Sequence, residues 1–183
     1  MNPAEHSEAN SAAAPSADIQ VFLSLFTLYD DRLRGYVARL LGVYGQAALD
    51  DVMQEVWCRV FERLDTVRDS DRIRSWLFAI AHNTGVAFHR RPPDAPTAAD
   101  NVEESAEDAY LASLRGQFEL RRLLDLLPMQ QRAAILLIDL EEMTIVEAAE
   151  VLGCRYQTVA SRRRRGHEAL RAHLVQYDGG GEK

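Results

Sequence analysis

Helical periodicity runs through most of this chain and constrains it to an all-helical fold. Apolar residues recur every three to four positions, and no window shows the strict alternation of a half-buried strand. The pattern predicts one long helix from Val21 to Leu41, a second from Leu49 to Leu64 and a third from Ile73 to Phe88. Amphipathic helices of this length bury their apolar faces against one another. We therefore expect a compact all-α module of three to four helices over residues 18–91.

The segment from Thr144 to Leu170 has the pattern of two helices joined at a sharp turn. Thr144 can cap the first helix, and Glu147 three residues later completes a capping box. Gly153 follows where the turn needs a residue without the Cβ penalty at positive φ. The second helix is expected to begin near Arg155. This layout is typical of a helix-turn-helix, which places its second helix in the DNA major groove.

The second of these helices carries four consecutive arginines, at 162–165. At roughly 100° per residue, Val159, Gly166 and Leu170 share its packed face, and amide, hydroxyl and guanidinium groups point outward. An outward Gln suits an adenine edge and an Arg suits guanine or phosphate. An arginine run alone is more often a solvated helix face, but the turn and the cap favour DNA. We expect DNA contacts from Arg155, Tyr156, Gln157, Thr158, Ser161, Arg162, Arg164 and Arg165, whereas Arg163 falls in the apolar stripe, where only its stem can be buried.

Composition changes mark the ends of the modules. The third helix is expected to end at the two arginines and two prolines at 90–93. Proline lacks a backbone N–H donor and disfavours the helical conformation of the residue before it. Residues 92–116 hold turn formers and acids with little to bury, which predicts an acidic flexible linker. Helical periodicity resumes over residues 117–176, with a break at Pro128. The expected fold is two small helical domains on this tether, with flexible tails at 1–17 and 177–183.

The net charge of −7 argues superficially against a nucleic-acid partner, but the charge is segregated. Residues 92–120 hold seven acids against one base, whereas residues 71–91 hold four arginines against one acid. The basic segment and the arginine-rich helix can therefore bind phosphates despite the acidic total.

Several function classes find no support in the residues. Cys58 and Cys154 lack the paired spacing of a disulfide or zinc site, so both are expected to be packed small hydrophobes. No Ser, His and Asp grouping and no Gly-rich phosphate loop appear, so we expect no catalysis, metal or cofactor. The longest apolar run, Ala133–Ile138, is far too short to span a bilayer, and residues 1–16 lack the blocks of a signal peptide. We expect a cytoplasmic protein without membrane insertion.

Three motifs in order resemble those of bacterial sigma factors of the extracytoplasmic-function (ECF) group. LDDVMQEVWCRVFERL (Leu49–Leu64) is similar to the family's polymerase-binding helix, and IRSWLFAIAHNTGVAFHRR (Ile73–Arg91) to its minus-10 element helix. LLDLLPMQQRAAILLIDLEEMTIVEAAEVLGCRYQTVASRRRRG (residues 123–166) is similar to its minus-35 reader. The resemblance covers about residues 20–174. It implies sigma region 2 over 18–91 and sigma region 4 over 117–176.

The resemblance assigns roles to residues of the first module. It implies docking on the β′ clamp helices of RNA polymerase by Asp50, Asp51, Gln54 and Glu55. It implies a minus-10 groove, with a flipped base held by the loop at 65–72, and the groove can be supplied by Arg68, Arg72, Arg74, His82, Asn83, Arg90 and Arg91. Trp76 shares the stripe of Ile73 and Ile80, so we expect it in the core rather than stacked on a base. The chain departs from the family's usual residues at Ala87, His82, Arg155, Ala160 and Arg163.

These features together predict a sigma factor without enzymatic activity of its own. Its expected partners are core RNA polymerase, through the β′ clamp helices and the β flap, promoter DNA, and an anti-sigma factor. We expect a monomer when it is free of partners. Two alternatives remain open at this point: a stand-alone helix-turn-helix regulator, which would be a symmetric oligomer on a palindrome, and a sigma mimic that titrates an anti-sigma factor.

Overall fold

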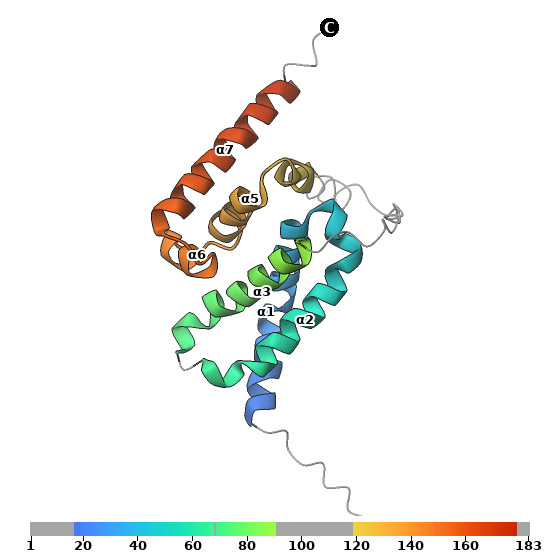
Figure 1. Cartoon of the computed structure of the whole chain (residues 1–183), viewed down its shortest axis with the longest axis vertical. Coiled ribbons are helices and arrows are strands. Elements are labelled where there is room, and N and C mark those ends of the chain that lie inside the picture. The colour runs from blue at the N-terminus through green and yellow to red at the C-terminus, as the bar shows by residue number, and fades with distance from the viewer. Residues whose placement is uncertain (1–16, 68, 91–118, 179–183) are drawn as a thin grey trace, which may run out of the picture.

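The computed structural model describes residues 17–67, 69–90 and 119–178, and every regular element in these ranges is a helix (Figure 1). Residues 1–16 of the predicted tail (1–17), the linker at 92–116 and residues 179–183 of the predicted tail (177–183) lie outside the described residues, and the described ends of both tails are helical. The all-α prediction is confirmed.

Three helices form the first module, close to the predicted positions: α1 (Ala17–Leu41), α2 (Leu49–Glu62) and α3 (Ile73–His89). The short 3-10 turns Val43–Ala48, Leu64–Thr66 and Ser70–Arg72 connect them. The apolar stripes meet in a core, where Tyr36 and Phe78 pack edge to face with ring centroids 5.4 Å apart. Fully or almost fully buried residues come from all three helices: Leu33, Val37, Leu40, Val56, Val60, Leu77 and Ala81. Trp76 packs partly buried against this core, as expected.

The second module begins with a helical stretch at residues 119–125 and continues through α5 (Met129–Ile135), the π-helical turn η4 (Leu136–Leu140), α6 (Ile145–Val151) and α7 (Tyr156–Asp178). The predicted break at Pro128 is present, since Pro128 is the residue before α5. Gly166 is buried where α7 crosses α5, and a Cβ there would lie only 2.6 Å from Cδ1 of Ile135. The glycine therefore lets the two helices approach closely.

The two modules also pack directly against each other. Figure 1 shows α6 and α5 beside α3 and α1, and the apolar core is continuous from one module to the other. This packing was not predictable, since no pattern in the sequence identifies which residues of one module face the other.

Two expectations about the first module are wrong in detail. Cys58 is exposed rather than packed, whereas Cys154 does contact the core. Phe26 and Phe61 belong to the predicted apolar stripes but are 40% and 52% exposed. They line a groove built from α1 and α2 alone, on a side of this helix pair where no third helix contributes to the lining.

Candidate nucleic-acid interface

The turn of the helix-turn-helix has the geometry that its sequence predicts. Thr144 accepts a hydrogen bond from the backbone N–H of Glu147 (3.2 Å), and the Glu147 carboxylate accepts one from the backbone N–H of Thr144 (2.7 Å). The Thr144 hydroxyl also lies 2.7 Å from the Glu147 carboxylate, and hydrogen bonds from this hydroxyl and from the Thr144 backbone N–H hold the pKa of Glu147 below its usual range. Gly153 has φ of 58°, in the left-handed region. The capping box and this glycine together fix where α6 ends and where α7 begins.

The start of α7 presents its polar residues to solvent. Arg155 lies just before the helix, and its carbonyl oxygen accepts hydrogen bonds from Thr158 and Val159. The exposed side chains here are those of Arg155, Tyr156, Gln157, Arg164 and Arg165, while Thr158, Ser161 and Arg162 are half-buried. Val159 is fully buried and faces the core, as the helical period predicts. The predicted reading face is therefore available to a ligand in this conformation.

Arg163 points away from that face and toward η4. Its guanidinium forms a two-pronged contact with Asp139, at 3.0 Å from Nε and 2.5 Å from Nη2, and His167 Nε2 lies 2.9 Å from the same carboxylate. Burial disfavours the charged form of Asp139, but the hydrogen bonds from Arg163 and His167 outweigh it and lower its pKa. An arginine in the apolar stripe is thus accommodated by an acid on the neighbouring element, which sequence periodicity could not reveal.

The predicted minus-10 residues are spread over α3 and the turn before it. Asn83 and Arg90 are exposed, whereas Arg72 and Arg74 lie beside α6 of the second module. Arg68 and Arg91 lie outside the described residues. The described part of this set is therefore divided between open surface and the contact between the modules.

His82 cannot add positive charge to the groove in this conformation. Its Nδ1 lies 2.9 Å from the hydroxyl of the buried Tyr36. Burial, with a further contribution from the charge of Arg162, lowers the pKa of His82 to about 4. The imidazole is neutral at pH 7, so the basic character of this surface rests on the arginines.

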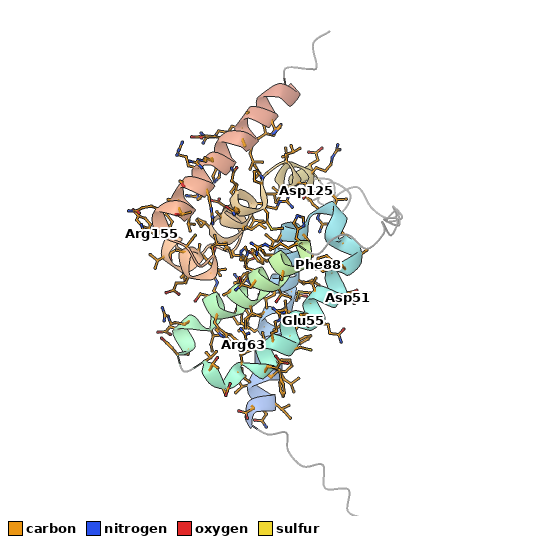
Figure 2. All side chains as sticks on the ribbon, viewed as in Figure 1. Asp51, Glu55, Arg63, Phe88, Asp125 and Arg155 are labelled. Carbon is orange, nitrogen blue, oxygen red and sulfur yellow. The ribbon has the colours of Figure 1, made fainter. Side chains whose placement is uncertain are left out.

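The four residues predicted to bind polymerase form an exposed edge along α2. Figure 2 shows Asp51 and Glu55 on the side of the molecule opposite Arg155. Asp50 forms an ion pair with Arg34 (2.5 Å) and Glu55 one with Arg59 (2.7 Å), while Asp51 and Gln54 are exposed. The edge is therefore exposed and acidic, and the ion pairs with Arg34 and Arg59 partly neutralise the carboxylates of Asp50 and Glu55.

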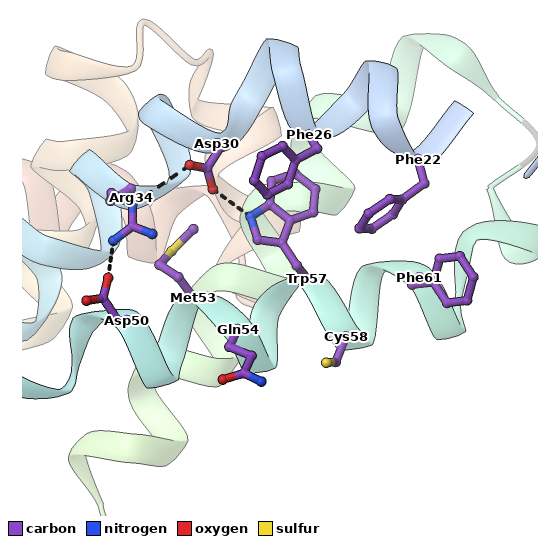
Figure 3. A pocket seen from close by; sticks show the side chains of 10 residues that line it. All are labelled: Phe22, Phe26, Asp30, Arg34, Asp50, Met53, Gln54, Trp57, Cys58 and Phe61. Carbon is purple, nitrogen blue, oxygen red and sulfur yellow. Dashed lines mark hydrogen bonds and ion pairs between the residues drawn. The ribbon is translucent and has the colours of Figure 1, made fainter. Parts of the chain in front are cut away.

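An aromatic groove adjoins this edge, and the sequence reasoning missed it as a surface. Figure 3 shows Phe22, Phe26, Trp57 and Phe61 along the groove. The indole of Trp57 donates a hydrogen bond to Asp30 (2.7 Å), and the ring of Phe22 packs edge to face on it with centroids 5.7 Å apart. The sequence offers no signal for this groove, because phenylalanines in an apolar stripe can be recognised as exposed only in the folded structure.

The described residues contain no cluster of histidine, cysteine and carboxylate side chains able to hold a metal ion. Within the same ranges, no helix is both long and apolar enough to cross a membrane.

Comparison with known proteins assigns both modules. Residues 25–91 match the family described as Sigma-70 region 2, and residues 117–170 match Sigma-70, region 4. The chain is 31% identical over 160 residues to the ECF RNA polymerase sigma-E factor of Escherichia coli, which covers 79% of this chain and 84% of that protein. It is 29% identical over 167 residues to the RNA polymerase sigma-H factor of Pseudomonas aeruginosa, covering 84% and 86% respectively. The solved structure of CnrH in complex with the cytosolic domain of CnrY matches with a TM-score of 0.66 and 25% identity, over 88% of this chain and 92% of that one.

Proposed function

The chain belongs to the ECF group of RNA polymerase sigma factors, which direct promoter recognition and transcription initiation, and we propose that it binds each of its partners through a separate surface. The sigma-type modules imply that RNA polymerase and promoter DNA are its partners. We also propose that the chain has no enzymatic activity of its own and acts in the cytoplasm.

The start of α7 reads the minus-35 element. Gln157 is exposed one residue into the helix, where a recognition helix meets base edges, and its amide can pair with adenine. Arg164 and Arg165 are exposed further along the helix, within reach of guanine or phosphate. Arg155 offers no side-chain acceptor to the first turn, so backbone donors at the helix start are free to meet a phosphate. This assignment rests on one observation: the side chains of Arg155, Gln157, Arg164 and Arg165 are exposed on α7 or just before it, directly after the turn at Gly153.

The basic part of α3 binds the melted minus-10 element. Melting leaves a single strand, whose phosphates need a positively charged surface. Arg72, Arg74 and Arg90 supply this charge, and Asn83 supplies an exposed amide. The predicted roles of Arg68 and Arg91 remain part of this proposal.

The α2 edge and the aromatic groove together bind the polymerase. Asp51 and Gln54 provide polar contacts for a basic helical partner, while Phe26 and Phe61 provide exposed apolar area beside them. A surface with an apolar centre and a charged edge suits a helix pair such as the β′ clamp. We also propose that an anti-sigma factor controls this chain, since the structurally similar sigma factor RpoE of Bartonella quintana was solved in complex with the anti-sigma factor NepR.

The decisive test is run-off transcription with purified core RNA polymerase from the host bacterium. Start sites mapped after controlled overexpression would supply the promoter template. RNA initiation that depends on this chain is the expected result. No initiation on any mapped template, despite stable binding of an anti-sigma factor, would instead favour a sigma mimic, and promoter binding by a symmetric oligomer without polymerase would favour a stand-alone regulator.

Matched variants test the surfaces separately. Gln157→Ala should weaken initiation because it removes the proposed contact with the minus-35 element. Gln130→Ala, which removes an exposed amide on α5, should leave initiation unchanged. Asp51→Lys should weaken binding of core enzyme, while the same charge change at the exposed Glu119 should have little effect. Equal effects of variant and control would contradict the assigned surface.

A further inference from the structure

The helix α7 is held against its own module by few buried side chains. Between its first residue and Leu174, only Val159 and Gly166 are buried, whereas Leu170 is half-buried. Gly166 has no side chain that could resist a rotation of α7 about its own axis. A Cβ there would lie 2.6 Å from Cδ1 of Ile135, so α5 and α7 approach closely at this point. The apolar contact therefore brings the two helices together but restrains the rotation of α7 weakly.

A carboxylate on η4 supplies the restraint that this apolar contact lacks. Asp139 follows Ile135 by four residues and lies on the side of η4 that meets α7. Nε and Nη2 of Arg163 donate to Oδ1 of Asp139 at 3.0 and 2.5 Å, and Nε2 of His167 lies 2.9 Å from Oδ2. Both carboxylate oxygens are therefore engaged by α7. We refer to Asp139, Arg163 and His167 as the Asp139 cluster.

The spacing of the two partners makes the Asp139 cluster a restraint on orientation. Arg163 and His167 are four residues apart, which places them one turn apart on the same face of α7. One contact would leave the helix free to turn about it, whereas two contacts on successive turns do not. The guanidinium is planar and holds Asp139 through two nitrogens, so it fixes the direction of the contact as well as its length.

The side chains that read the minus-35 element lie on another face of the same helix. Gln157 and Arg164 are exposed and lie roughly 100–120° around the helix from Arg163. A rotation of α7 by about 10° moves a side-chain atom about 6 Å from the helix axis by about 1 Å. Hydrogen-bond distances tolerate a variation of only about 0.5 Å. A small rotation of α7 is therefore sufficient to break a bidentate contact with a base.

We propose that Asp139 is a positioning residue for minus-35 recognition, which sets the rotation of α7 through Arg163 and His167. This inference deepens the proposed role of α7 and rests on it. The Asp139 cluster lies where α7 meets η4, so its effect on DNA is transmitted by the helix as a whole. Its loss should consequently impair every base contact of α7 together, whereas the loss of one reading side chain such as Gln157 impairs one contact.

The test is run-off transcription by holoenzyme assembled from core RNA polymerase and the full chain, with two templates competing in one reaction. One template carries a mapped promoter, and the other carries the same promoter with one base pair of the minus-35 element replaced. The two transcripts differ in length, and their ratio measures discrimination at that base pair. A smaller fraction of active protein reduces both transcripts equally, so a loss of stability by itself leaves the ratio unchanged.

Two substitutions break the Asp139 cluster from its two sides. Asp139→Asn keeps the shape of the side chain and removes its charge, and Arg163→Met keeps the apolar stem of the arginine. Glu142→Gln is the matched control, because it removes the same charge at an exposed position three residues from Asp139. Gln157→Ala identifies the base pair that Gln157 reads.

Asp139→Asn is expected to lower the ratio about threefold or more at every base pair that α7 reads, whereas Gln157→Ala lowers it at one. Arg163→Met should lower the ratio at the same set of base pairs. The double variant should lose no more than Asp139→Asn, because both substitutions break the same contact. Glu142→Gln should stay within about twofold of the wild-type ratios, since the loss of one negative charge strengthens binding to both templates alike.

Three results overturn the inference. Wild-type ratios in both Asp139→Asn and Arg163→Met show that the Asp139 cluster does not orient α7, and the proposed reading by α7 then still stands. A loss confined to one base pair shows that the substituted residue acts by direct contact with DNA. An equal loss in Glu142→Gln assigns the effect to charge rather than to orientation. A wild-type holoenzyme that initiates without discrimination at any minus-35 base pair instead refutes the proposed reading by α7, and the inference with it.

Discussion

The contact between Arg163 and Asp139 permits a quantitative test of how α7 is held in place. The two side chains are 38% and 22% exposed, and two guanidinium nitrogens contact the carboxylate. Hydrogen bonds to charged groups contribute about 1.5–3 kcal/mol when buried, and exposed ion pairs contribute about 0.2–1 kcal/mol. Solvent screening at the half-exposed arginine places this pair between the two ranges, so we expect a coupling free energy of about 1 kcal/mol.

A double-mutant cycle with Arg163→Met and Asp139→Asn measures this coupling from urea unfolding of the four proteins. Met keeps the apolar stem of Arg163, and Asn keeps the shape of Asp139, so the cycle isolates the charge contact. The neighbouring pair Arg164–Glu168 is a matched control, because it is an exposed i,i+4 pair at 65% and 55% exposure. Its coupling should be about 0.3–0.5 kcal/mol.

The pH dependence of the coupling provides a second check. Because the pKa of Asp139 is lowered in the folded chain, the stabilisation is fully present above the unfolded value and is lost as the pH falls through the folded value. A coupling for Arg163–Asp139 no larger than that of the exposed control, or one that persists in strong acid, would refute the assignment of Arg163 as the residue that fixes α7 on η4.

Three further predictions follow from the same structure. Because the pKa of His82 is lowered to about 4, the unfolded chain binds more protons than the folded chain below pH 6.5. Between pH 8 and pH 5 the wild-type chain should therefore lose about 2 kcal/mol more unfolding free energy than His82→Gln does, as measured by urea unfolding. Parallel pH profiles of the two proteins would contradict this. Thr144→Ala removes the cap of α6 and should cost about 1 kcal/mol of stability by thermal or urea unfolding, with Thr27→Ala on the exposed face of α1 as a control; equal losses would argue against the capping role. Gln157→Ala should reduce discrimination at one base pair of the minus-35 element by about 1–3 kcal/mol in duplex binding competition, whereas a uniform loss across all sequences would mark Gln157 as a phosphate contact.

Local features of the fold were predictable because their causes lie within a few residues. The helices α1, α2 and α3 follow from apolar spacing, and the turn of the helix-turn-helix follows from a capping box and a glycine. The exposure of the start of α7 follows from the same periodicity, since Val159 and Gly166 share the buried face of the helix. These features depend on propensity and pattern, which act within a helical turn or two.

The candidate site was only partly predictable. The arginines of α3 were identifiable as basic residues on a helix, but the neutral state of His82 depends on its burial in the folded chain and on the charge of Arg162, which lies 80 positions away in sequence. The exposed positions of Phe26 and Phe61 depend on where other helices do not pack. Burial is a property of the assembled chain, so the period of a helix shows which residues share a face but not what covers that face.

The helices, the turn of the helix-turn-helix and the membership of the chain in its family could therefore all be predicted from the residues alone. The pairing of Arg32 with Glu141, of Arg72 with Glu150 and of Arg163 with Asp139 is visible only in the folded chain. The difference arises from how far apart in the sequence the interacting residues lie. Hydrogen-bond ladders and helix caps join neighbours along the chain, whereas ion pairs between modules join residues 78 and 109 positions apart, whose meeting depends on how every intervening element packs.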